Sequence, residues 1–200
     1  MNLPRTALGK WLWLALSVIV ADQWTKFLIT SNFSEFDSIT LLPILDFMRL
    51  HNEGAAFSLL SDASGWQRWV FTILGSAVSI FIFLWLRRLP VRGQHMLAAA
   101  LTLIMGGALG NVIDRILWGH VIDFIRVHYQ QWYFPAFNIA DSAITVGAAL
   151  LILDTLLYRD QPADSRKQPS KKKVTKKKGS QKKTSKKKSP KKKSPKKKTV

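Results

Sequence analysis

The sequence predicts a mainly α-helical, polytopic membrane protein. It has four transmembrane helices, a small extracytoplasmic subdomain that contains β-strands, and a disordered basic C-terminal tail. Residues 1–164 contain four apolar stretches long enough to cross a hydrocarbon core of about 30 Å, which takes about 20 helical residues. The two longest connections between them include β-branched and aromatic segments. Residues 165–200 hold 19 of the 30 basic residues and no acidic residue.

The four spans of the membrane domain, residues 1–164, are expected at about residues 11–29, 69–86, 95–113 and 137–158. The alternative is four buried helices of a soluble bundle, but the second stretch carries no charge, which is rare in such proteins. The first stretch begins like a secretory signal peptide. Position −3 from a cut after Ala21 would be Ile19, which is not a small residue. We therefore expect an uncleaved first span.

The basic residues near the span ends predict the orientation of the chain. Arg5, Lys10, the short connection 87–94 and the tail are basic and are expected in the cytoplasm. Both termini would then be cytoplasmic, and the two longer connections, about residues 30–68 and 114–136, would face outward.

The outward connections are expected to contain a small sheet. Residues 38–50 are rich in Ile, Leu, Phe and Thr, which favours two short strands interrupted near Pro43 and Asp46. Residues 121–128 have β-branched and aromatic character. We expect this segment to pair with the first connection.

The tail, residues 165–200, repeats three lysines followed by two small residues, as in Lys186–Pro190 and Lys191–Pro195. Such a segment cannot bury a core and is expected to be disordered. Residues 1–164 carry 11 basic and 12 acidic residues, so the net charge of +18 belongs to the tail. Three interpretations stay open: attraction to anionic lipid, worth about 1 kcal/mol per basic residue near the surface, binding to nucleic acid, and a solvated extension without a partner.

Acidic residues gather at one side of the predicted membrane domain. At 1.5 Å per residue, Asp114 and Asp141 lie about 28 and 25 Å from the inner ends of their spans, and Asp123 lies on the connection between them. A carboxylate in a membrane is costly and therefore indicates function. Asp123 and Asp141 suggest an acid–base pair, because two close carboxylates share a proton. One could then donate to a scissile carbonyl while the other takes a proton from water.

Helical spacing predicts further neighbours. Asn111, Asp114 and Arg115 fall at i, i+3 and i+4 and so share one helix face. Asp22 and Lys26 are i and i+4, which is compatible with either a surface ion pair or a functional role. Asn138 stands three residues before Asp141, and a stripe of small residues favours close helix packing. That stripe is Gly106, Gly107 and Gly110.

Other catalytic schemes fit the sequence poorly. The chain has no cysteine, no serine lies at helical spacing from Lys26, and no Gly-x-Ser-x-Gly occurs. None of the histidine pairs has the helical spacing of a metal site, so we expect neither a metal nor a cofactor. Two non-peptidase functions stay open. A proton-coupled transporter would be expected to distribute polar groups over the full membrane depth, and a membrane anchor for nucleic acid would depend on the tail.

Five segments together resemble the lipoprotein signal peptidases, also called signal peptidase II. They are residues 22–26, 52–57, 106–115, 121–124 and 137–141. Any one would be weak, but all five occur in the family's order over about residues 10–158. The resemblance implies an aspartic endopeptidase of the bacterial cytoplasmic (inner) membrane with Asp123 and Asp141 as its dyad. Its substrate would be a prolipoprotein whose cysteine carries diacylglycerol, cut just before that cysteine.

The resemblance also implies roles for the remaining polar residues. Four match family positions that line the site or contact the substrate: Asn52, Asn111, Arg115 and Asn138. Three are expected to support the site's architecture: Asp22, Lys26 and Asp114. We expect a monomer in contact with membrane lipids. The tail is outside the family pattern and inherits no function from it.

Overall fold

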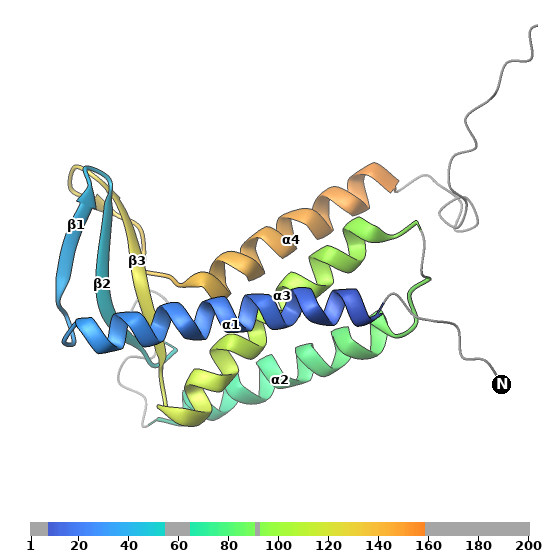
Figure 1. Ribbon diagram of the computed structural model, residues 1–200, viewed down its shortest axis with the longest axis horizontal. Coiled ribbons are helices and arrows are strands. Elements are labelled where there is room, and N and C mark those ends of the chain that lie inside the picture. Colours follow the sequence, from blue (N-terminus) through green and yellow to red (C-terminus); the bar gives the residue numbers. More distant parts are fainter. Residues whose placement is uncertain (1–7, 55–64, 91–92, 159–200) are drawn as a thin grey trace, which may run out of the picture. The chain divides into compact units, whose positions relative to one another are not determined.

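The computed structural model describes residues 8–54, 65–90 and 93–158, and all of them lie in one compact unit (Figure 1). The helices are α1 (Leu8–Asn32), α2 (Trp66–Leu86), α3 (His95–Leu117) and α4 (Ile139–Tyr158). The strands are β1 (Ser38–Leu42), β2 (Leu45–Asn52), β3 (Val121–Tyr129) and β4 (Trp132–Tyr133). All four helices are long and apolar enough to cross a membrane. The predicted fold class is therefore confirmed for this part of the chain, and the basic tail lies outside it.

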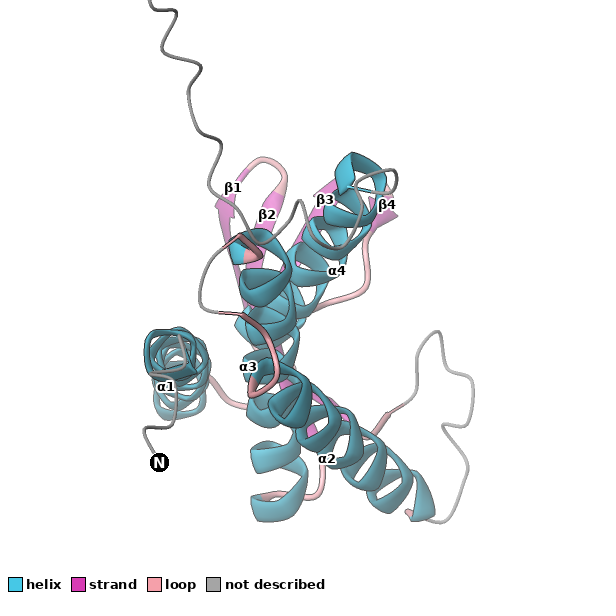
Figure 2. Cartoon of the chain, turned by 90° about the vertical axis from the view of Figure 1, so that its right-hand side faces the viewer, coloured by secondary structure: helices cyan, strands magenta, loops and turns pink. Residues whose placement is uncertain are grey.

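Helix α3 is the centre of the bundle. It packs against each of the other three helices, and Figure 2 shows it between α1 and α2. In α3, 67% of the most apolar window is buried, compared with 22–28% in the other helices. Apolar side chains on those helices, such as Trp24, Ile73 and Leu156, are exposed. Such a surface suits lipid, which solvates apolar side chains as well as a protein interior does.

The glycine stripe of α3 allows the close packing that the sequence predicted. A Cβ at Gly106 would lie 3.1 Å from the carbonyl oxygen of Ala15 on α1, and one at Gly107 would collide with the carbonyl oxygen of Ala140 on α4. Gly147 of α4 lies equally close to the backbone of α3. Helix α3 is thus held backbone to backbone against both α1 and α4.

The four strands form one antiparallel sheet in the order β1-β2-β3-β4. The pairing of β2 with β3 joins the two long connections, as predicted, and places Asn52 opposite Val121. Ile122 and Phe124 pack with Ile29 of α1 in an apolar cluster. Because side chains alternate along a strand, Asp123 points to the other face of β3.

The bounds of the helices differ from the predicted spans by up to four residues. Helix α3 continues to Leu117, so Asp114 and Arg115 belong to its last turns. Helix α4 starts at Ile139 because the residue two positions earlier, Phe137, still pairs with β3 through two backbone hydrogen bonds to Ile125 of 2.9 and 3.0 Å.

Candidate functional site

The two predicted aspartates meet at the junction between the sheet and the bundle, where Asn138 contacts both. Asp123 comes from β3 and Asp141 from the first turn of α4. The side-chain nitrogen of Asn138 donates to Asp123 Oδ1 at 2.7 Å. The side-chain oxygen of Asn138 accepts from the backbone nitrogen of Asp141 at 2.9 Å. Asn138 and Asp123 are almost completely buried, with 0% and 1% exposure.

The segment Asn138-Ile139-Ala140-Asp141 forms a capping box, and this explains why Asp141 is so well placed. Asn138 precedes the helix and caps the backbone nitrogen of its third residue. The carboxylate of Asp141 accepts in return from the backbone nitrogen of Asn138 at 3.3 Å. Asp141 also sits at the helix N-terminus, where the helix dipole stabilises a negative charge. Local helix-start chemistry therefore fixes one carboxylate of the pair.

Asn111 of α3 fixes Asp141 from the other side. Its side-chain nitrogen donates to Asp141 Oδ1 at 2.7 Å, and its oxygen accepts from Lys26 Nζ at 3.0 Å. Lys26 also forms ion pairs of 2.8 Å with Asp22 and 2.7 Å with Asp114. These contacts form a continuous hydrogen-bonded path from α1 through α3 to the aspartate of α4.

The Asp22–Lys26 pair is buried, with 0% and 2% exposure, so its interpretation as a surface ion pair is wrong. Helical spacing alone could not reveal this, because the burial comes from α3, which adds Asp114 as a second carboxylate. A buried pair needs such additional hydrogen bonds to offset its desolvation. Gln23, to which the sequence analysis assigned no role, supplies another by donating to Asp114 Oδ1 at 2.8 Å.

Asp22 and Asp114 bind not only Lys26 but also backbone amides close to the two aspartates of the site. Asp22 Oδ1 accepts from the backbone nitrogen of Ala140 at 2.9 Å, one of the amides that a helix start leaves without an intrahelical partner. Asp114 Oδ2 accepts from the backbone nitrogen of Ile122 at 3.3 Å, next to Asp123. Thus Asp22 holds the start of α4, and Asp114 holds the strand that carries the other aspartate.

Asn52, at the end of β2, is the third amide in contact with the aspartates. Its nitrogen donates to Asp123 Oδ2 at 2.9 Å, and its oxygen accepts from the backbone of Gly54 at 2.8 Å. Gly54 has φ of +110° and no room for a Cβ beside the ring of Phe71, so both its conformation and its surroundings require glycine. The rest of this motif, residues 55–57, lies outside the described residues.

Arg115 of α3 makes fewer contacts than the other predicted site residues. Its guanidinium lies over the ring of Phe71, with 5.2 Å between the guanidinium carbon and the ring centroid. One long hydrogen bond of 3.5 Å reaches the backbone oxygen of Asn111. Within the described part of the chain it forms no ion pair. Arg115 therefore makes no direct contact with the carboxylates among the described residues, although Asp141 and Asp123 are near enough for their charges to act on it.

The electrostatics of the site favour one shared proton. Burial and, after it, the negative charge of Asp141 together raise the pKa of Asp123 to about 7. Hydrogen bonds from Asn52 and Asn138 act against this shift without cancelling it. A carboxyl that is protonated near neutral pH beside a second carboxylate has the properties of a general acid–base pair.

Comparison with known proteins supports the same chemistry. A family model described as signal peptidase (SPase) II matches residues 14–157. A lipoprotein signal peptidase of Acinetobacter baumannii is 54% identical over 157 residues, which are 77% of this chain and 89% of the relative. One of Pseudomonas fluorescens is 55% identical over 146 residues, 72% of this chain and 85% of the relative. A bacterial membrane enzyme solved by the in meso method superposes with a TM-score of 0.67 at 33% identity, covering 76% of this chain and 90% of that one.

The matched region contains the whole of the site described above, including both aspartates and the three amides that hold them. It also contains four helices that are able to cross a membrane. The chain therefore belongs to the signal peptidase II family, the aspartic peptidases of the bacterial inner membrane that remove signal peptides from prolipoproteins.

Proposed function

We propose that Asp123 and Asp141 are the catalytic dyad of this peptidase, and that Asp123 holds the shared proton before the reaction. The observation that carries the proposal is the contact of Asn138 with both residues, which brings a carboxyl of raised pKa beside a carboxylate at a helix N-terminus. The substrate is a prolipoprotein whose cysteine carries diacylglycerol. The scissile bond is the peptide bond before that cysteine.

The two carboxyl groups would exchange roles during the reaction. First, Asp141 takes a proton from water, the water oxygen bonds to the scissile carbonyl carbon, and the proton of Asp123 moves to the carbonyl oxygen. Next, the carbon–nitrogen bond breaks, and Asp141 gives its proton to the leaving nitrogen of the cysteine. A hydroxyl proton of the intermediate returns to Asp123. The dyad ends in its starting state, and one water has been consumed.

The other polar residues would support this chemistry in two ways. Asn52, Asn111 and Asn138 orient the carboxyl groups, since each donates a hydrogen bond to one of them. Arg115 has its charge available for a polar group of the substrate. The structural residues are Asp22, Lys26 and Asp114, which hold the helices and the strand that carry the site.

We propose that the sheet end of the bundle faces the periplasm and that both termini are cytoplasmic. This orientation puts the dyad at the periplasmic surface of the inner membrane. A prolipoprotein is held there by its lipid and its signal helix. Because the chain has no cysteine, single-cysteine variants can test the orientation with an impermeant thiol reagent. A cysteine in the turn between β1 and β2 should react in intact spheroplasts, whereas one at position 2 should not.

We also propose that the enzyme is a monomer and that its tail binds anionic lipid rather than nucleic acid.

Cleavage of a diacylglyceryl-modified prolipoprotein peptide by the purified protein in detergent tests the dyad. Asp123→Asn and Asp141→Asn keep the shape of each side chain and should each reduce cleavage by about 1,000-fold or more, because an amide cannot exchange the proton. Asp37→Asn is the matched control, since Asp37 is exposed and its carboxylate caps a turn. Cleavage at the wild-type rate by either dyad variant, in folded form, would overturn the assignment.

A further inference from the structure

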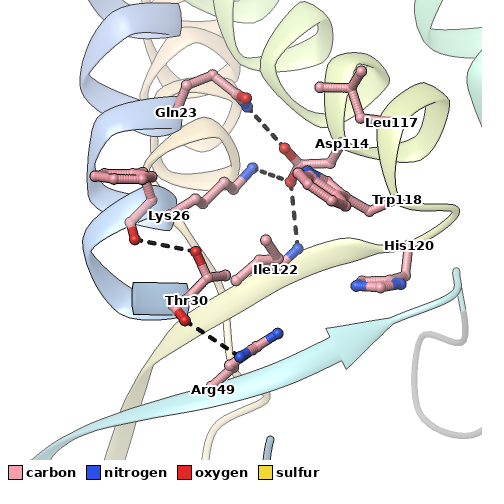
Figure 3. A pocket seen from close by; sticks show the side chains of 10 residues that line it. Gln23, Lys26, Thr30, Arg49, Asp114, Leu117, Trp118, His120 and Ile122 are labelled. Atoms are coloured by element: carbon pink, nitrogen blue, oxygen red, sulfur yellow. Dashed lines mark hydrogen bonds and ion pairs between the residues drawn. The ribbon is translucent and has the colours of Figure 1, made fainter. Parts of the chain in front are cut away.

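A cavity of about 350 Å³ lies against the opposite face of β3 from the aspartates (Figure 3). Ile122 is in its wall, and the next residue, Asp123, points away from it, as alternation along a strand requires. One face of α1, the end of α3 and the strands β2 and β3 enclose it. The cavity is therefore separate from the site of peptide cleavage, although Lys26 and Asp114 lie between the two.

The lining of this cavity contains one cation that no carboxylate balances. The charge of Lys26 is compensated by its two ion pairs, one of them with Asp114 in the same wall. Arg49 of β2 forms no ion pair in the described part of the chain. Its Nη1 donates to the backbone oxygens of Phe33 at 2.9 Å and Thr30 at 3.4 Å, and its Nε donates to His51 at 3.3 Å. Among the described residues its Nη2 has no hydrogen-bond partner, so this nitrogen is available to a ligand.

His120 adds a second polar group with unused capacity. Its ring stacks on that of His51 with 3.9 Å between the centroids, and within the described residues its nitrogens make no hydrogen bond. Burial lowers the pKa of His120, and the adjacent His51 lowers it further. A neutral imidazole can donate one hydrogen bond and accept another. The cavity thus offers a charged donor from β2 and a neutral one from the residue just before β3.

The rim of the cavity is apolar and exposed. Phe27, Leu117 and Trp118 line it with exposures of 59%, 62% and 64%. They lie near the sheet ends of α1 and α3, and tryptophan is enriched at that depth, where lipid headgroups meet the hydrocarbon. A ligand in this cavity would have a polar part at Arg49 and an apolar part in contact with lipid.

We infer that this cavity binds a phospholipid from the leaflet at the sheet end of the bundle, with the phosphate at Arg49 and His120 and an acyl chain along Phe27, Leu117 and Trp118. Guanidinium groups suit phosphate because they offer several donors in a fixed plane. A free inorganic phosphate would make no use of the apolar rim. A neutral diacylglycerol would leave Arg49 without an anion. This site does not depend on the assignment of the dyad.

Native mass spectrometry of the full chain released from detergent micelles tests the inference with three added probes: phosphatidylglycerol, diacylglycerol of the same acyl chains, and inorganic phosphate. We expect one tightly retained phosphatidylglycerol, little retained diacylglycerol, and no displacement by phosphate. Arg49→Gln should weaken retention about tenfold, the effect of one lost charge-assisted hydrogen bond. Arg49→Lys should restore part of it.

Arg49 also holds the end of α1 through Phe33, so Arg49→Gln could lower stability by itself. Thr30→Trp avoids this problem, because it fills the cavity from α1 and keeps the arginine. It should reduce retention at least as much, with peptide cleavage unchanged. Arg68→Gln is the matched control, since Arg68 lies near the same end of α3 but outside the lining, and should retain phospholipid normally. Equal retention of diacylglycerol, displacement by phosphate, or undiminished retention in folded Thr30→Trp would overturn the inference.

Discussion

Asn138 Nδ2 lies 2.7 Å from Asp123 Oδ1, so the residue that caps α4 also holds the aspartate of β3. Through its oxygen the same side chain holds Asp141. One amide therefore sets the relative position of the two carboxyl groups. The cap that starts α4 is therefore also the contact that brings the two aspartates together.

Asn138→Ala should abolish cleavage and also lower stability. Loss of the cap should cost about 1 kcal/mol, and the buried carboxyl of Asp123 would lose a donor. Asn138→Ser separates the two effects, because serine is also a preferred cap but its shorter side chain does not reach Asp123. We expect thermal unfolding in detergent closer to that of the wild type than for Asn138→Ala, with cleavage still lost. Asn32→Ala, at an exposed amide that bonds only its own helix, should change neither quantity. Normal cleavage by Asn138→Ser would show that the amide donor is dispensable.

The activity should fall as the pH rises above about 7, because Asp123 then loses the proton that it donates. Measurement of kcat/KM between pH 5 and 9 tests this.

The stability of the folded protein should also depend on the titration of Asp123. The pKa of Asp123 is about 7 when folded and near 3.8 when unfolded, so its contribution to stability is complete below pH 3.8 and is lost as the pH rises through 7. Asp123→Asn does not titrate. Its melting temperature should exceed that of the wild type by more at pH 8 than at pH 5, and an equal difference at both would contradict the shift.

Gly110→Ala should destabilise the protein although alanine has the higher helix propensity. A Cβ at position 110 would lie 2.7 Å from Asp22 Oδ2, the oxygen that pairs with Lys26. The overlap should cost about 1–3 kcal/mol and displace the carboxylate. Gly9→Ala, also within a helix, meets nothing within 4 Å and should be neutral or slightly stabilising. Thermal unfolding of the two variants side by side gives the comparison, and equal melting temperatures would refute the proposed contact.

Asp22→Ala should mainly lower stability. It removes the acceptor for the amide of Ala140 and one of the two carboxylates around Lys26, and breaking a buried ion pair typically costs about 3–5 kcal/mol. The remaining folded enzyme should cleave, because Asp22 does not touch either proposed catalytic residue. Unfolding in denaturant and activity per folded molecule are the two measurements. An unchanged stability with lost cleavage would instead place Asp22 in the catalytic machinery.

Much of the fold follows from simple properties of the sequence. The length of the apolar runs predicts four helices, and β-branched residues in the connections predict the β2–β3 pairing. The exact start of α4 does not follow from these properties, because it depends on the pairing of Phe137 with β3 and on the cap at Asn138. That cap could have been recognised from Asn138-x-x-Asp141, a spacing that is typical of a capping box.

The sequence alone could not predict the contacts that join distant segments. Lys26 looks like half of a surface pair until α3 covers it and adds Asp114. The pairing of β2 with β3 brings Arg49 of β2 and His120, just before β3, to one cavity although they are 71 positions apart in the chain. These relationships depend on how helices and strands approach one another in three dimensions, which local periodicity does not encode.

The shared role of Asn138 has a consequence for inhibitors of this enzyme. A compound that contacts Asp123, Asp141 and Asn138 would bind residues whose replacement either stops the proposed chemistry or loosens the start of α4. Escape by substitution would then have to occur at the periphery, where side chains touch the compound but do not hold the site. A drug confined to this small buried group of side chains would leave bacteria few routes to resistance.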